Sequence, residues 1–96
     1  MTIEKTVNGT TAEWKPIGWL DLQNAPAMEA ELNALDSGIT ALVIDCAGLE
    51  YISSAGLRQL VAAYKKMNGE LTLKNVSDEI MNVISMTGLD KRLKII

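Results

Sequence analysis

The chain has 96 residues, of which 48% are apolar and 22% charged, and this is the composition of one small globular domain rather than of a disordered segment. The chain has nine Lys and Arg residues and twelve Asp and Glu residues, so its net charge is −3. This charge argues against a nucleic-acid-binding surface. The absence of histidine and the single cysteine argue against Ser-His-Asp and Cys-His nucleophilic sites, a zinc site and an internal disulfide. We therefore expect no enzyme active site, no metal and no cofactor.

The sequence also predicts a cytoplasmic location. Its longest apolar run is far shorter than the ~20 residues that cross a bilayer, so no membrane insertion is expected. The first residues lack the charged-then-apolar order of a signal peptide, and a free cysteine suits a reducing compartment.

The chain begins with two segments that are typical of a β-hairpin. Residues 2–7 alternate in polarity, and Asn8-Gly9 favours a type I′ turn, whose two central residues both need a positive φ. Pro16 has no N–H to donate, so we expect the second strand to be broken there, at a sheet edge or a bulge. Residues 18–21 then close that strand.

A first helix is predicted after this hairpin. Asn24 is a suitable cap, and Pro26 belongs in a first turn. Apolar residues follow at helical spacing, and Ser37-Gly38 is expected to end the helix. The stripe consists of Met28, Leu32 and Leu35.

A central strand and helix follow. Residues 41–45 are nearly all apolar, as is typical of a strand covered on both faces. Cys46, just after them, is expected to be an unreactive apolar filler. Apolar residues from Leu57 onward recur at i, i+3, i+4 and i+7, which predicts a helix over about residues 54–67. This helix should begin at the Ser53-Ser54 pair.

The last third of the chain predicts a strand over residues 70–74 and a helix that Ser77 caps and Gly88 ends. A short strand over residues 93–96 completes the order ββαβαβαβ. We therefore expect a single small α/β domain, residues 1–96, with a mixed β-sheet covered by helices.

Serine at a helix start is either a cap or a hydroxyl presented for chemistry, because the free first-turn N–H groups also favour an oxyanion. A nucleophile elbow is excluded, since Ile52 occupies the place where that motif needs glycine if Ser54 is the nucleophile. Asp21, Asp45 and Glu50 are interpreted as solvated or capping residues rather than an acid–base pair. What is left is a small scaffold that presents a hydroxyl.

The segment LVIDCAGLEYISSAGLRQL resembles the signature of the STAS domain family, in particular the bacterial anti-sigma factor antagonists. Residues 52–57 are similar to its phosphorylation loop, often Asp-Ser-Ser/Thr-Gly-Leu, and residues 18–21 to its Gly-x-Leu-Asp. Asp45 with Gly48 resembles its Asp-x-x-x-Leu/Val loop, and Gly88-Leu89 its late Ser/Thr-Gly-Leu element. The likeness spans about residues 7–96 and implies the STAS fold.

The resemblance implies a partner switch. The unphosphorylated protein would sequester a kinase-type anti-sigma factor, this serine kinase would phosphorylate it with ATP, and a metal-dependent serine phosphatase would reverse the change. Ser54 is the expected acceptor, by its aligned position and its expected fit to the N-cap, with Ser53 as the alternative. Ser53 stands where the family usually has Asp, and Ala55 where it has Ser or Thr. The expected partner interface comprises Trp19, Asp21, Ser53, Gly56, Leu57 and Arg58.

Several alternatives stay open. Trp19 could instead cover the core, Gly56 could be a packing glycine, and Asp21 a strand-end turn residue. The whole protein could be a non-switching STAS subunit of a transporter or signalling assembly, or a weak nucleotide-binding or hydrolysing protein. Many relatives continue into a further helix beyond the position of Ile96, so we also expect uncovered apolar sheet and self-association as a homodimer.

Overall fold

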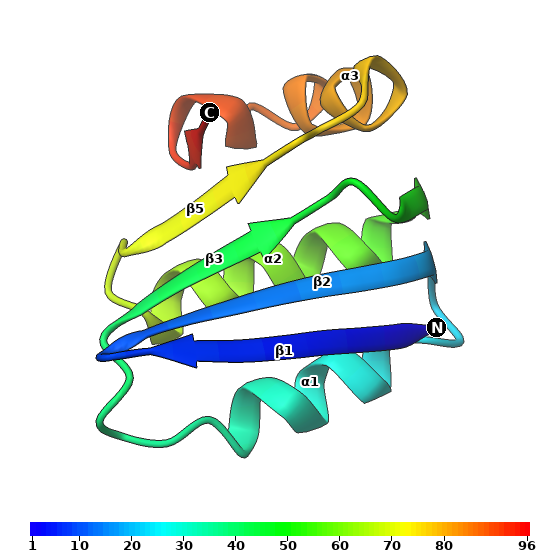
Figure 1. Ribbon diagram of the computed structural model, residues 1–96. Coiled ribbons are helices and arrows are strands. Elements are labelled where there is room, and N and C mark those ends of the chain that lie inside the picture. The colour runs from blue at the N-terminus through cyan, green and yellow to red at the C-terminus, as the bar shows by residue number, and fades with distance from the viewer.

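A computed structural model describes residues Met1–Ile96 as one mixed six-stranded sheet with three α-helices and one short 3₁₀ helix (Figure 1). The strand order is β1-β2-β3-β5-β6, β4 pairs with the second half of β2, and only the β1–β2 pair is antiparallel. The expected α/β class is confirmed, with β4 and η1 as additions to the predicted order. In chain order the elements are β1 (Thr2–Asn8), β2 (Thr11–Leu20), α1 (Ala25–Asn33), β3 (Ala41–Asp45), β4 (Leu49–Ile52), α2 (Ser54–Lys66), β5 (Leu71–Lys74), α3 (Asp78–Met86), η1 (Leu89–Lys91) and β6 (Lys94–Ile95).

The hairpin is present, but its turn lies one residue later than expected. Asn8 pairs with Thr11, so Gly9 and Thr10 are the central residues. Only Gly9 of these two has a positive φ, of 66°. A positive φ confined to the first central position is the requirement of a type II′ turn, so the predicted type I′ turn is wrong.

The prediction that β2 would be broken at Pro16 is also wrong. The strand is continuous over ten residues. Its first half, to Trp14, pairs with β3, and its second half, from Gly18, pairs with β4. Pro16 falls between the residues that pair with β3 and those that pair with β4. No hydrogen bond to these two strands therefore requires the N–H that proline lacks. The irregularity that we expected at Pro16 is between Gly18 and Trp19 instead.

Both main crossover helices, α1 and α2, cover the same face of the sheet (Figure 1). The chain moves in one direction from β2 to β3, β5 and β6, and right-handed crossovers in one direction place their helices on one side. In β3, Leu42 and Ile44 are therefore buried, whereas Val43 and Asp45 are half-buried on the other side. The expectation of a central strand covered on both faces is wrong.

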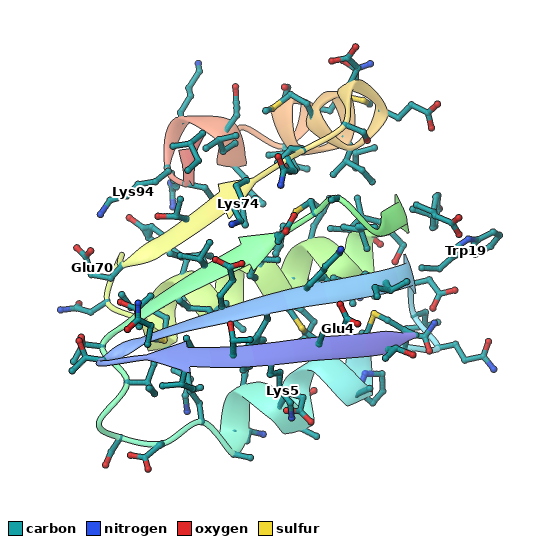
Figure 2. All side chains as sticks on the ribbon, viewed as in Figure 1. Glu4, Lys5, Trp19, Glu70, Lys74 and Lys94 are labelled. Carbon is teal, nitrogen blue, oxygen red and sulfur yellow. The ribbon has the colours of Figure 1, made fainter.

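The open face of the sheet is mainly polar. Lys74 on β5 forms an ion pair with Glu13 on β2 at 3.1 Å. Lys94 on β6 forms one with Glu70 at 3.0 Å, and both of these residues are labelled in Figure 2. The side chains of these ion pairs are about one-third exposed or more. Salt screens such pairs, so they stabilise the fold little, and they keep the face hydrated. The expected uncovered apolar surface lies mainly at one end of the sheet, where Trp19 and Tyr51 are exposed.

The core lies between the sheet and the helices and contains no buried polar or charged side chain. Cys46 belongs to it, as expected, and burial raises the pKa of its thiol to about 12, with a smaller contribution from the charge of Asp45. The thiol is thus protonated near neutral pH and is a poor nucleophile. None of the helices has the length and apolarity that a bilayer span requires. The largest fully buried side chains are Leu20, Met28, Leu42, Ile44, Ile52, Leu71, Leu73, Ile84 and Pro16.

The start of α3 agrees with its prediction, whereas the end of α1 does not. Ser77 caps α3 as expected, because its Oγ accepts a hydrogen bond from Ile80 N at 3.2 Å. By contrast, α1 ends at Asn33, four residues before the predicted stop at Ser37-Gly38. Leu35, which was assigned to the helical stripe, packs against the core from the following loop.

Candidate functional site

The two serines singled out by the sequence lie where β2 and β4 end and α2 begins. Ser53 follows the last residue of β4, and Ser54 is the first residue of α2. Ser53 N donates a hydrogen bond to Leu20 O at 3.0 Å. This bond joins the end of β2 to the start of the helix, so the buried last residues of two strands, Leu20 and Ile52, hold the serines in place.

Ser53, rather than Ser54, is the N-cap of α2. Ser53 retains the extended backbone of β4, with φ −102° and ψ 179°, and its Oγ accepts a hydrogen bond from Gly56 N at 3.4 Å. Extended dihedrals at the residue before the first helical turn are what a cap requires. The expected fit of Ser54 to the cap is therefore wrong. Its hydroxyl is exposed on the first helical turn.

Gly56 and Leu57 face the inside of the protein. A Cβ at Gly56 would lie 2.4 Å from Leu20 O and 2.7 Å from Ile52 Cγ1. Leu57 is buried in the core cluster. The packing-glycine alternative is thus confirmed, and these two residues position α2 against β2 and β4 without adding exposed surface beside Ser54.

Trp19 is exposed, and the alternative in which it covers the core is wrong. It pairs in register with Tyr51 on β4, with ring centroids 5.5 Å apart and planes tilted by 51°. The side chains are 56% and 47% exposed, and Trp19 projects beyond the end of the sheet (Figure 2). Tyr51 was missed because a strand of four residues is too short for its polarity pattern to show which side chains face the core.

Asp21 is a turn residue at the end of β2, as the alternative proposed. Its Oδ1 accepts a hydrogen bond from Asn24 N at 3.0 Å. The side chain of Asn24 donates in turn to Trp19 O at 2.9 Å rather than capping α1. These bonds stabilise the turn that carries the backbone of Trp19. Arg58 is exposed and, four residues after Ser54, lies on the same side of α2.

Asp45 is a capping residue at the end of β3. Its Oδ1 accepts hydrogen bonds from Asn75 Nδ2 at 2.9 Å and from Ala47 N at 3.0 Å. These two bonds, the Asn75 bond foremost, hold the pKa of the carboxyl below its ordinary value. Asp45 therefore ties the β3–β4 loop to the residue after β5 and is ionised at neutral pH.

We expect Asp45 to make stability pH-dependent in acid. Because the folded-state pKa is below the ordinary value of 3.8, the stabilisation is complete above that value and is lost as pH falls through the folded pKa. Urea denaturation between pH 5 and pH 2.5 should show a smaller loss of unfolding free energy for Asp45→Asn than for wild type. Asn75→Ala, which removes the main bond to the carboxylate, should also reduce the slope. Equal slopes in all three proteins would contradict this assignment.

Other parts of the molecule offer no competing reactive centre. No three side chains of His, Cys, Asp or Glu are grouped so that they could hold a metal ion. A cavity of about 600 Å³ lies between the β1–β2 hairpin and the end of α1. Ala12 lines this cavity near one end of β2, whereas Ser53 bonds to Leu20 at the other end. The exposed hydroxyl of Ser54 therefore remains the candidate group.

Residues 2–96 match the STAS domain model, and the chain belongs to the STAS domain family. Several proteins it is similar to are named as anti-sigma factor antagonists, and one solved structure as a sulfate transporter family protein. The resemblance to the STAS family found in the sequence is confirmed. BtrV of Bordetella bronchiseptica, named as an anti-sigma factor antagonist, is 37% identical over 75 residues, which are 74% of this chain and 65% of BtrV. The chain thus matches just under two-thirds of the length of this relative.

Solved structures agree with this assignment. An anti-sigma factor antagonist from Mycobacterium paratuberculosis has a TM-score of 0.86 at 29% identity, covering 98% of this chain and 83% of its own. The anti-sigma factor antagonist SpoIIAA, in its unphosphorylated form, has a TM-score of 0.77 at 14% identity, covering 99% and 87%. SpoIIAA from Bacillus in the phosphorylated form has a TM-score of 0.68 at 16% identity, covering 99% and 91%. At such identities SpoIIAA supports the fold alone.

Proposed function

We propose that this protein is a phosphorylation-controlled anti-sigma factor antagonist. In its unphosphorylated form it binds and sequesters a kinase-type anti-sigma factor, and phosphorylation of Ser54 ends this binding. The observation that carries the proposal is the division of roles at the start of α2, where the Ser53 hydroxyl caps the helix and the Ser54 hydroxyl is exposed. The names of the relatives support the same class, and SpoIIAA is a protein of this fold with a phosphorylated form.

The chain supplies the phosphate acceptor, and its partner supplies ATP and the kinase groups. The Ser54 Oγ attacks the γ-phosphorus of ATP, a new phosphorus–oxygen bond forms, and the bond to the β,γ-bridging oxygen breaks to release ADP. The hydroxyl proton passes to a base of the kinase. A metal-dependent serine phosphatase later hydrolyses the phosphoserine with water and restores the hydroxyl.

The start of α2 can carry a phosphate without unfolding. Phosphorylation adds a charge of about −1.5 to −2 and three acceptor oxygens. First-turn N–H groups and the helix dipole stabilise such an anion, and Arg58 lies one turn further along the same side. The modification therefore changes the surface that a partner meets rather than the fold, and a partner packed against Ser54 would have to bury a dianion.

The first experiment is intact-mass spectrometry of the purified protein after incubation with a candidate anti-sigma kinase and ATP. Wild type should gain one phosphate that maps to Ser54, and Ser54→Ala should gain none. Ser53→Ala is the matched control, because it should lose about 1 kcal/mol of stability with its cap yet still accept phosphate. A metal-dependent serine phosphatase should return the wild-type mass to its starting value.

Two results would contradict the proposal. Phosphate mapped to Ser53 would transfer the acceptor role to the cap residue. Failure of every cognate kinase to modify the protein would favour the alternative of a constitutive STAS subunit in a transporter or signalling assembly.

A further inference from the structure

Exposed apolar side chains are concentrated at the end of the sheet that carries Ser54. Four of the seven large apolar side chains that are exposed lie on the last part of β2, on the turn after it or on β4. The other three are distributed over the far end of β1, the end of α3 and the end of the chain. The four are Ile17, Trp19, Leu22 and Tyr51.

Trp19 and Tyr51 are exposed, but the strands that carry them are paired and anchored in the core. Leu20 and Ile52, the next residues along each strand, are buried in the core, so the two rings project from the opposite face of the sheet. Their strands are paired in register at this point, and the rings contact each other. Aromatic rings with few rotatable bonds on paired strands lose little conformational entropy on binding.

A kinase interface of standard size that is centred on Ser54 can reach this pair. Tyr51 precedes Ser54 by three residues, so their Cα atoms are at most about 10 Å apart. A standard interface buries about 800 Å² on each partner, which corresponds to a disc of about 16 Å radius. Trp19 lies against Tyr51, so both rings fall inside an interface centred on the phosphate acceptor.

We propose, on the basis of the function proposed above, that Trp19 and Tyr51 form an aromatic anchor for the kinase-type anti-sigma factor. The anchor occupies an apolar recess of that partner and supplies affinity, whereas Ser54 supplies the switch. Buried aromatic residues near the centre of an interface commonly carry most of its binding energy. Leu22, 73% exposed in the turn after β2, extends the apolar surface of the anchor.

The test is isothermal titration calorimetry with the kinase in a Ser54→Ala background, which prevents phosphate transfer during the titration. Adding Trp19→Ala should weaken binding at least about 30-fold, Tyr51→Ala should also weaken it, and Trp19→Phe should recover part of the loss. Met86→Ala removes an apolar side chain of α3 that is 86% exposed and should leave the affinity unchanged. Circular dichroism should show all variants folded, since these side chains lie outside the core.

A kinetic readout separates an anchor from a residue that orients the hydroxyl. With the Ser54 hydroxyl present, Trp19→Ala should raise the KM for this protein as kinase substrate and leave kcat unchanged. This is the result expected when a lost contact stabilised the bound ground state and the transition state equally. Wild-type affinity in both Trp19→Ala and Tyr51→Ala, or a fall in kcat alone, would overturn the anchor. So would a homodimer of this chain that dissociates in Trp19→Ala, because the patch would then be a self-association surface.

The anchor and the proposed function can fail separately. If wild type is phosphorylated on Ser54 and released normally while Trp19→Ala binds like wild type, only the anchor is wrong. If wild type neither binds nor is modified by any cognate kinase, the proposed function is wrong as well.

Discussion

A single methyl group added at Gly56 is expected to lower the free energy of unfolding by about 2–3 kcal/mol, at the upper end of usual overpacking costs. The new Cβ would lie 2.4 Å from Leu20 O and 2.9 Å from Leu20 Cγ, so α2 would have to move away from β2. In an open helix the same change would stabilise by about 1 kcal/mol, because alanine has the better propensity. Urea denaturation of Gly56→Ala with an unchanged m-value would measure the difference.

Gly38→Ala is the matched control for this substitution. Its φ is not positive, and its Cβ would meet only the side-chain Oδ1 of Asp36, at 3.3 Å. A compatible Gly→Ala change alters stability by about 1 kcal/mol or less. If Gly56→Ala were as stable as wild type, the close contact between α2 and Leu20 would be disproved. The shift of α2 away from β2 would also displace the Ser54 hydroxyl, because the contact between Gly56 and Leu20 sets the position of the helix start.

The second large effect concerns binding. Ser54→Asp is expected to weaken binding to the kinase-type anti-sigma factor by about 100-fold or more, because an unpaired charge buried at an interface costs about 3 kcal/mol. Stability should stay the same or rise slightly, since an acid in the first turn of a helix is favoured by about 0.3–1 kcal/mol. Calorimetric titration with the partner and thermal denaturation of the variant would measure the two quantities independently.

Ser37→Asp provides the matching charge change elsewhere. Ser37 is exposed in the loop between α1 and β3, so an acid there should alter neither affinity nor fold. Binding of Ser54→Asp that is as tight as that of wild type would rule out a switch based on charge at this position. Weak binding by both variants would instead point to an effect of net charge.

The sequence predicted the start of α2 correctly but not which of the two serines caps it. The spacing of Leu57 and the following apolar residues indicated a helix starting at Ser53-Ser54, and α2 begins there. Which serine caps depends on where the extended backbone of β4 ends, and this is decided by pairing with β2. Because β4 and the second half of β2 are distant in sequence, no local pattern could distinguish the cap from the exposed hydroxyl.

Local chemistry by itself determined much of the framework. Residues 41–45 form β3 at the predicted bounds, and Ser77 caps α3, because alternation, apolar spacing and a hydroxyl three residues before a free N–H are properties of neighbouring residues. Cys46 is buried, as its position after an apolar strand indicated.

Only the tertiary structure decided which surfaces are covered. The one-sided sheet follows from successive crossovers in the same direction, and a run of apolar residues in β3 does not contain that information. The packing of Gly56 against Leu20 and the Trp19–Tyr51 pair likewise join residues more than thirty positions apart. The spacing of apolar residues indicates which secondary structure a segment favours, but the burial of its side chains depends on which distant segment packs against it. For this protein that choice positions the hydroxyl of Ser54 and the aromatic pair at the same end of the sheet.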